Sequence, residues 1–533
     1  MKVSENNLKI VLNDFFKGII SLIISQILIK IFGVIYSIYI TNKTGFGDAG
    51  NAIYMSGYQI YALLLTISSI GVPNAISKII SEKKSQKDYI NIDRVFKISV
   101  FLFSCIGFCG CVILYIFSKY IATNLLLIPE ATLSLKVLSP AVFFVSVTSV
   151  VRGFCNGEGK IYITAKSQFF EQVLKTIFTI SFVEIVSKIS NNNTEAMASI
   201  ANFATTMATF FSLIYISLKY FKLRKKVNNF SFAVYPKERI SLIIKKVLKI
   251  SIPITIGTIL TSFGKNIDSI TVVRILRNII GEENAIIKYG ILSSKVDIIM
   301  MLPLSFNIAI STSLIPEISK QKAVGNLSRV LKNIKFSFLI TSMIAIPATF
   351  GLFVYSKQIF NLLFPNAQNG YELLKLSALG LIFSLLTQTI NGILQGIGEN
   401  NIPVYSAMCG LIIKLFSNIF LIRIDGILEK GAVIGNILSS FVSFIIVYYV
   451  LRRKINLDFS LVNIIKKPFL CSIIMIIISF SCYNYFIFKN VNYSISIIIS
   501  LIIAVIIYGI GVFVTKMIKK EYISESIENT GKF

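Results

Sequence analysis

The hydrophobic residues of this chain fall into fourteen long stretches that are separated by short polar gaps. In chain order, spans 1 to 14 lie near residues 15–40, 50–72, 98–118, 133–154, 163–187, 196–218, 246–272, 287–315, 336–356, 372–394, 401–424, 431–451, 468–488 and 491–515. Each span has about the 20 residues that an α-helix needs to cross the hydrocarbon core of a bilayer. The pattern predicts an all-α integral membrane protein with fourteen transmembrane helices.

Composition supports this prediction, because 54% of the residues are hydrophobic. The net charge of +28 does not indicate nucleic acid as a partner, since a nucleic-acid surface gathers its basic residues on one soluble face. Here they cluster in the gaps after spans 2, 6, 8 and 12, whereas Lys43 and Lys489 are the only basic residues in the gaps after spans 1 and 13. Cytoplasmic loops carry the excess of Lys and Arg. We therefore expect both termini on the cytoplasmic side of the plasma membrane.

Several classes of chemistry are disfavoured by the residue types that are present. The chain contains no histidine, which removes Ser-His-Asp and Cys-His catalytic pairs and histidine metal ligands. The seven cysteines lie mostly inside spans, where apolar burial explains them better than a disulfide framework does. The first span lacks a signal-peptide cleavage pattern and is interpreted as retained. We expect no catalytic residue, no metal and no cofactor, and the coupling ion stays open.

A repeat within the sequence divides the chain. The segment Arg152–Gly159 at the end of span 4 matches Asn391–Gly398 at the end of span 10, and three glycines share one offset (392 − 153 = 239). Lysines 136 and 375, and lysines 175 and 414, have the same offset. An even number of spans separates the copies, which predicts two parallel six-helix repeats with two extra C-terminal helices. We expect an N-lobe at 1–221, a C-lobe at 222–455, and spans 13 and 14 with a cytoplasmic tail at 456–533.

The repeated glycines have two interpretations. G-x-x-x-G spacing lets helix backbones approach closely, and the last glycine permits a tight turn. Phosphate binding by the turn is the alternative. Close packing is the interpretation that we favour.

Burying an ionisable residue inside a membrane span costs free energy, so such a residue indicates a functional site. Spans 1, 5, 7, 8 and 11 carry them, whereas spans 3, 6, 9, 12, 13 and 14 carry none. Lys30 lies near mid-membrane, about 15 residues into its span at a rise of 1.5 Å per residue. If the lobes face each other, these side chains line a hydrated, positively charged cavity that suits a phosphate-bearing ligand. We predict that the cavity contains Gln26, Lys30, Lys265, Asp268, Arg274, Lys295 and Asp297.

A second group of charges is expected to pair the lobes or to gate the cavity. Glu171 and Lys175 have the favourable i, i+4 order of a helical ion pair, so they either neutralise each other or take part in gating. Lys175 also has a counterpart in the second repeat. The group consists of Arg152, Glu171, Lys175 and Lys414.

Three segments resemble a known family. They are 58–78 (YQIYALLLTISSIGVPNAISK), 152–175 (RGFCNGEGKIYITAKSQFFEQVLK) and 252–319, which begins IPITIGTILTSFGKNIDSITVVRIL. They resemble stage V sporulation protein B and its relatives, which are polysaccharide-type members of the multidrug/oligosaccharidyl-lipid/polysaccharide exporter superfamily and include lipid II flippases. The resemblance covers essentially the whole chain.

The resemblance implies a V-shaped bundle of two six-helix lobes, with spans 13 and 14 beside a lipid-facing groove. It implies a flippase that moves an undecaprenyl-pyrophosphate-linked sugar across the plasma membrane by alternating access, in spore cortex or cell-wall synthesis. By the same resemblance, basic residues in the cavity are expected to hold the pyrophosphate, and the positions carried over are Lys30, Lys265, Asp268 and Lys295. The expected partners are a polyprenyl-linked glycolipid and membrane lipid, and no protein partner is indicated.

Two other functions remain open. A cation-coupled multidrug exporter needs an acidic cavity, whereas basic residues outnumber acidic ones within the spans. A membrane glycosyltransferase or ligase that uses a polyprenyl carrier would need a sizeable extracytoplasmic loop with carboxylates. The gap at 191–195 holds one acidic residue.

Overall fold

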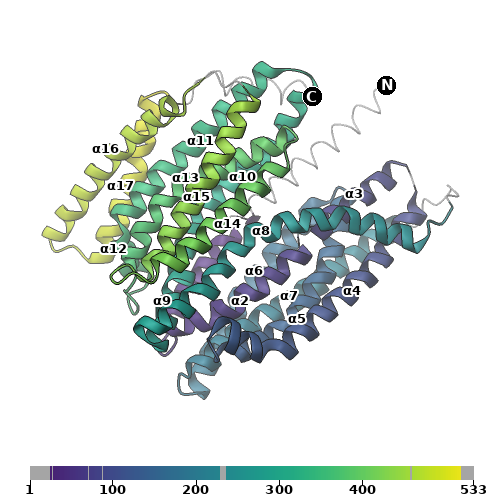
Figure 1. Ribbon diagram of the computed structural model, residues 1–533, viewed down its shortest axis with the longest axis horizontal. Coiled ribbons are helices and arrows are strands. Elements are labelled where there is room, and N and C mark those ends of the chain that lie inside the picture. Colours follow the sequence, from purple (N-terminus) through teal and green to yellow (C-terminus); the bar gives the residue numbers. More distant parts are fainter. Residues whose placement is uncertain are drawn as a thin grey trace. The chain divides into compact units, whose positions relative to one another are not determined.

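The computed structural model describes residues 25–26, 28–69, 71–86, 88–227, 236–455 and 459–517. Throughout these ranges every regular element is a helix, which confirms the all-α prediction (Figure 1). The chain divides into two compact units, the first ending at Ser294 and the second beginning at Lys295. The division into lobes at 1–221, 222–455 and 456–533 stays a prediction.

The first unit contains the described end of the first helix, Leu28–Asn42, and the elements from α2 to α9. These are α2 (Gly47–Ser69), α3 (Gly71–Ser85), α4 (Tyr89–Tyr120), the π-helical turn η1 (Ile121–Leu126), α5 (Ala131–Gly157), α6 (Ile161–Ile189), α7 (Thr194–Val227), α8 (Ile240–Ile280) and α9 (Glu282–Gly290).

The π-helical turn η2 (Ile291–Val296) crosses into the second unit. There follow α10 (Asp297–Ala323), α11 (Leu327–Val354), α12 (Ser356–Leu363), α13 (Tyr371–Gly396), α14 (Asn401–Leu421), α15 (Lys430–Lys454), α16 (Leu461–Phe488) and α17 (Tyr493–Val514).

Ten helical segments in the described ranges are long and apolar enough to cross a membrane. They coincide with predicted spans 2, 3, 4, 6 and 9 to 14, so the chain is a multi-pass membrane protein. Span 1 lies partly outside the described residues. Spans 5, 7 and 8 are helical as α6, α8 and the α9–α10 region, and they are spans in which ionisable residues were noted. The count of fourteen stays a prediction.

The two units share an order of helix neighbours. In the first unit, α4 packs on α5, α5 on α7, and α7 on α6. In the second unit, α11 packs on α13, α13 on α15, and α15 on α14. The helices α5 and α13 contain the two copies of the glycine motif, so the sequence repeat coincides with a repeated packing order.

The first glycine of each motif lies where two backbones meet. A Cβ at Gly153 would lie 2.9 Å from the Cα of Pro73 on α3, and a Cβ at Gly392 would lie 2.8 Å from the carbonyl oxygen of Ser311 on α10. Side chains larger than hydrogen do not fit at such distances without a backbone shift. This geometry agrees with the close-packing interpretation of the motif.

The last glycine of each motif closes a helix by the same turn. Gly159 and Gly398 have φ values of +79° and +89°, which an L-residue adopts at a steric cost. In both turns the next N–H donates to the carbonyl five residues earlier, at 2.9 and 2.8 Å. Lys84 and Lys322 donate to the carbonyl just before each glycine, at 2.9 and 2.5 Å. These bonds satisfy carbonyl groups that the helix end leaves open.

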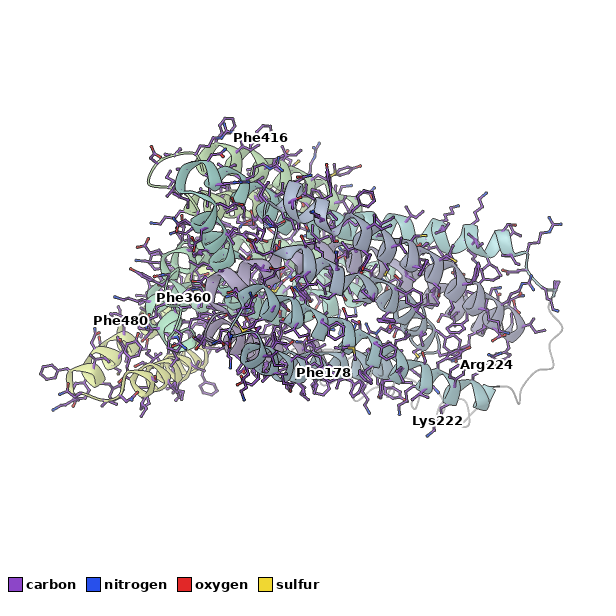
Figure 2. The ribbon with its side chains drawn as sticks, turned by 90° about the horizontal axis from the view of Figure 1, so that it is seen from below. Phe178, Lys222, Arg224, Phe360, Phe416 and Phe480 are labelled. Carbon is purple, nitrogen blue, oxygen red and sulfur yellow. The ribbon has the colours of Figure 1, made fainter. Side chains whose placement is uncertain are left out.

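Ion pairs join the ends of several helices in the first unit. Lys84, at the end of α3, contacts Glu158 after α5 at 2.8 Å. Arg224 contacts Asp93 near the start of α4 at 2.8 Å, and Figure 2 shows Arg224 beside Lys222 at the end of α7. The gaps that follow spans 2, 4 and 6 therefore lie at one end of this unit.

The gaps after spans 1 and 5 lie together as well. Lys43 pairs with Glu184 of α6 at 2.5 Å, and the Thr194 hydroxyl donates to the carbonyl of Gly45 at 2.6 Å. In the first unit, the gaps after spans 1 and 5 therefore lie together, and so do the gaps after spans 2, 4 and 6. This is the arrangement that alternating membrane crossings require.

Candidate functional site

Arg152 ties α5 to α6 and α7 through a buried polar network. Its guanidinium contacts the Glu171 carboxylate at 2.7 Å and the hydroxyl oxygens of Ser167 and Ser212 at 3.1 and 3.2 Å. Arg152 is 8% exposed, so a guanidinium without its counter-ion would be costly there. The i, i+4 spacing left open whether Glu171 neutralises Lys175, and in the structure Glu171 pairs with Arg152.

Lys175 instead lies among three tyrosine rings. Its Nζ is 4.0 Å from the ring centroid of Tyr58, 5.1 Å from that of Tyr36 and 5.9 Å from that of Tyr54. Tyr54 and Tyr58 come from α2, and Tyr36 comes from Leu28–Asn42. The Tyr36 and Tyr54 hydroxyls lie 3.3 Å apart. We call Lys175 with these three residues the tyrosine cage.

The cage surrounds the lysine charge with rings but gives it no counter-ion. Each cation–π contact contributes about 0.5–2 kcal/mol, and the effective cost of burying an ion is several kcal/mol. Lys175 is 5% exposed. Over the described ranges its contacts are with rings and not with a carboxylate.

Gln26 and Lys30 lie one helical turn apart on the first helix. The Gln26 amide donates to the side-chain oxygen of Gln168 on α6 at 2.9 Å. Lys30 is half-buried. The first helix and α6 therefore hold two residues of the predicted cavity, Gln26 and Lys30, and two residues of the predicted gate, Glu171 and Lys175, within the first unit.

The α8 residues of the predicted cavity have different environments. Asp268 is buried, at 9% exposure. Arg274 is exposed and donates to the carbonyl of Asn124 in η1 at 2.7 Å. Lys265 lies on α8, but its side chain is outside the described set.

In the second unit, Lys295 anchors the connection between α12 and α13. It is 0% exposed and donates to the carbonyls of Ala367 and Asn369, each at 2.7 Å. The rings of Phe360 and Phe364 lie 5.4 and 5.7 Å from its Nζ. Two carbonyl oxygens accept hydrogen bonds from the Lys295 ammonium, so in this structure Lys295 holds the loop between α12 and α13 in place.

Asp297 and Lys414 complete the predicted set in the second unit. Asp297 is half-buried in the first turn of α10. Lys414 on α14 is 5% exposed, which is the same exposure as that of Lys175, its counterpart in the sequence repeat.

The aromatic and hydroxyl partners of these charges were not predicted from the sequence. Tyr54, Tyr58 and Tyr61 recur along α2 at spacings of four and three, which places them on one helix face. That pattern was visible in the sequence. The partners Ser167 and Ser212 were not, because polar serines are frequent in these spans.

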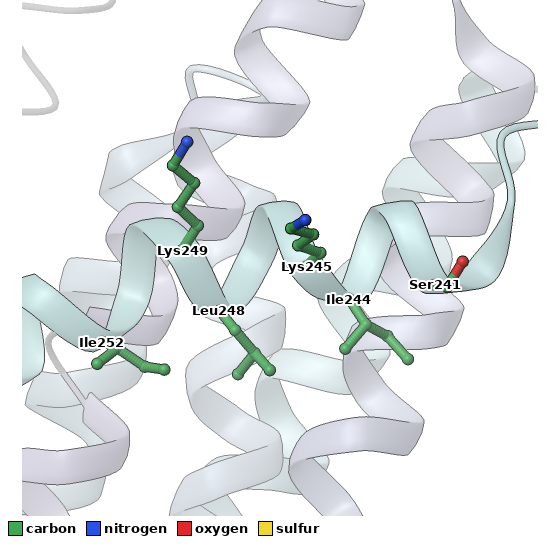
Figure 3. Close-up of a pocket in the computed structure, with 6 residues that line it drawn as sticks. All are labelled: Ser241, Ile244, Lys245, Leu248, Lys249 and Ile252. Carbon is green, nitrogen blue, oxygen red and sulfur yellow. The ribbon is translucent and has the colours of Figure 1, made fainter.

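An open hollow of about 560 Å³ follows the first turns of α8. Figure 3 shows its lysine and aliphatic side chains leaving the helix on different sides. Such a surface has the character of a helix at a membrane interface rather than of an enclosed ligand pocket. It is lined by Ser241, Ile244, Lys245, Leu248, Lys249 and Ile252.

Comparison with known proteins gives relatives that align over most of the chain. The chain is 24% identical over 478 residues to the lipid II flippase MurJ of Bacillus subtilis (strain 168), covering 87% of this chain and 86% of that protein. It is 20% identical over 401 residues to stage V sporulation protein B of the same strain, covering 75% and 76%. The resemblance stated from the sequence is confirmed.

Solved structures share the fold. MurJ in an inward closed conformation aligns with a TM-score of 0.71 at 14% identity, covering 94% of this chain and 100% of that one. An inward-facing multidrug resistance MATE family transporter of the MOP superfamily aligns with a TM-score of 0.66 at 14% identity, covering 81% and 94%.

Two families match the sequence itself. Residues 253–420 match the MatE family. Residues 15–322, more than half of the chain, match the family described as polysaccharide biosynthesis protein. The chain thus belongs to the polysaccharide biosynthesis protein family.

Proposed function

We propose that this chain is a flippase, not an enzyme, and that it moves a polyprenyl-diphosphate-linked sugar across the plasma membrane. A lipid II-like peptidoglycan precursor is the leading substrate, with a role in cell-wall or spore-cortex synthesis. The observation that carries this proposal is the family match, together with a relative named as a lipid II flippase that aligns over 87% of the chain.

The physical task explains why cations belong inside such a protein. A charged head group faces a large desolvation cost in hydrocarbon, so the protein must supply a hydrated basic passage while the polyprenyl tail stays in lipid. In this proposal two parallel lobes rock between inward-open and outward-open states around that passage. The repeated order of helix neighbours supports the two-lobe arrangement.

The residues of the proposed passage are those predicted from the sequence. Arg274 and Lys295 donate to backbone carbonyls in this structure, so a substrate would use them only after those bonds open. The proposed substrate-binding residues are Gln26, Lys30, Lys265, Asp268, Arg274, Lys295 and Asp297, and the residues proposed for gating or lobe pairing are Arg152, Glu171, Lys175 and Lys414.

Depletion in the native host tests the proposal. Levels of lipid-linked intermediates should be measured after the chain is depleted, with re-expression as the control. We expect an undecaprenyl-linked precursor to accumulate on the cytoplasmic leaflet. Unchanged pools of every such lipid would contradict the proposal.

A cation-coupled multidrug exporter is the second candidate, because residues 253–420 match the MatE family. The same depletion separates the two: loss of cationic dye efflux with unchanged lipid pools would favour the exporter. The relatives reported above are named as flippases, transporters or sporulation proteins, which gives a membrane glycosyltransferase no support.

A further inference from the structure

We propose that the tyrosine cage is an anion site of the first unit, in which Lys175 binds a phosphate or diphosphate group. The anion would contact the Lys175 ammonium, while the rings of Tyr36, Tyr54 and Tyr58 hold that ammonium in place. The assignment to phosphate rests on the proposed function. The need for an anion rests on the geometry alone.

A comparison of buried lysines carries the argument. Lys83 is 3% exposed and is paired with two carboxylates, those of Asp88 and Glu238. Lys295 is 0% exposed and donates to two carbonyls. In the described part of the chain, Lys175 is as deeply buried but contacts only rings.

The nearest acidic residue on the same helix is already occupied. Glu171 lies one turn before Lys175, yet its carboxylate contacts Arg152 at 2.7 Å. Releasing it would leave the buried guanidinium without a counter-ion. Lys175 therefore lacks a carboxylate from its own helix, and an external anion would supply the missing charge.

The three rings of the cage are not equally buried. Tyr36 and Tyr54 are 8% and 2% exposed, whereas Tyr58 is only half-buried. Tyr58 is also the ring nearest to the Lys175 Nζ. In this proposal the anion approaches the ammonium beside Tyr58, the least buried ring of the cage.

Phosphate suits this site for two reasons. Lysine is a compact point charge with three donors, and it binds phosphate without the bidentate geometry that arginine requires. The surrounding rings also exclude water, which strengthens the attraction between ammonium and anion.

Equilibrium dialysis of the purified full chain with radiolabelled inorganic pyrophosphate, at constant ionic strength, tests the site. We expect saturable binding that Lys175→Gln weakens by roughly tenfold to a hundredfold, the loss of one charge-assisted contact. Lys188→Gln is the matched control, because Lys188 lies on the same helix with a side chain that is 76% exposed. It should bind as the unaltered chain does.

A second pair of variants covers the case in which Lys175→Gln does not fold. Tyr58→Phe keeps the nearest ring and should retain binding, whereas Tyr58→Leu removes it and should weaken binding severalfold. Equal binding by Tyr58→Leu and the unaltered chain would overturn the cage. Equal binding by a folded Lys175→Gln, or an absence of saturable binding in the unaltered chain, would do the same.

A second probe, farnesyl diphosphate, distinguishes a site for a lipid-borne diphosphate from a site for free phosphate. Tighter binding than that of inorganic pyrophosphate, lost in Lys175→Gln, assigns a lipid-borne diphosphate. Equal affinities for the two probes, both dependent on Lys175, assign a site for free phosphate. These measurements do not involve transport, so the site can fail while depletion still supports a flippase, and the reverse also holds.

Discussion

Among single residues, the Arg152–Glu171 pair offers the sharpest test of buried charge. Glu171→Gln leaves the Arg152 guanidinium with two hydroxyl partners and no counter-ion. We expect a loss of about 2–3 kcal/mol in stability, seen as a lower thermal unfolding midpoint in detergent. Replacing both residues, as Arg152→Met with Glu171→Leu, should recover most of it. A double variant as unstable as the sum of the single variants would contradict this expectation.

Lys30 tests the proposed passage at the same scale. Lys30→Ala removes the half-buried cation of the first helix, so complementation of a depleted host should be lost while protein abundance stays normal. Lys188→Ala, at an exposed lysine on α6, should complement fully. Full activity of Lys30→Ala would remove this residue from the proposed site.

The sequence identified which residues need partners but not which partners they have. A charge in an apolar span is visible locally, and so Arg152, Glu171 and Lys175 were all selected. The choice of Arg152 over Lys175 as the partner of Glu171 joins residues 19 positions apart. That choice depends on how α5 packs beside α6, which hydropathy does not encode.

At the scale of elements, hydropathy located the apolar part of each helix and capping set its ends. Span 3 was predicted at 98–118, whereas α4 runs from Tyr89 to Tyr120. Its start follows Asp88, whose carboxylate accepts the N–H of Asn91 at 3.1 Å. An N-cap of this kind lies in the polar gap, where a hydropathy window does not detect it.

The glycine motif gives a prediction about helix packing. Gly153→Ala and Gly392→Ala place a Cβ within 2.9 and 2.8 Å of backbone atoms on neighbouring helices. Each should lower stability by about 1–3 kcal/mol through overpacking. Gly351→Ala in α11 meets no atom within 4 Å, so it should be neutral or raise stability by up to about 1 kcal/mol. Unfolding midpoints in detergent measure all three, and equal effects would refute the packing role.

At the scale of the whole molecule, the two-repeat organisation stays a prediction, and it rests on residues that recur at one offset. The three glycines with a common offset indicated two copies before any helix was placed, and the neighbour order of α4, α5, α7 and α6 recurs in α11, α13, α15 and α14. Spans 5, 7 and 8 were harder to count by apolarity, since their polar residues lower the hydropathy on which such counts depend.

Parallel repeats make a prediction about sidedness. Asn193 lies in the gap after span 5 and Lys222 in that after span 6, while Gln368 and Arg452 lie after spans 9 and 12, and all four are exposed. In a variant without the seven native cysteines, a cysteine at each position can be probed with a membrane-impermeant maleimide.

Intact cells should label Asn193→Cys and Gln368→Cys, because odd gaps face outward if Lys- and Arg-rich gaps are cytoplasmic. Lys222→Cys and Arg452→Cys should react only after the membrane is opened. Parallel repeats require Asn193→Cys to label as Gln368→Cys does, and Lys222→Cys as Arg452→Cys does, since an even number of spans separates the two members of each pair. Different labelling of the two members of either pair would exclude parallel repeats. Reversed labelling of all four positions would keep the repeats but place the termini outside.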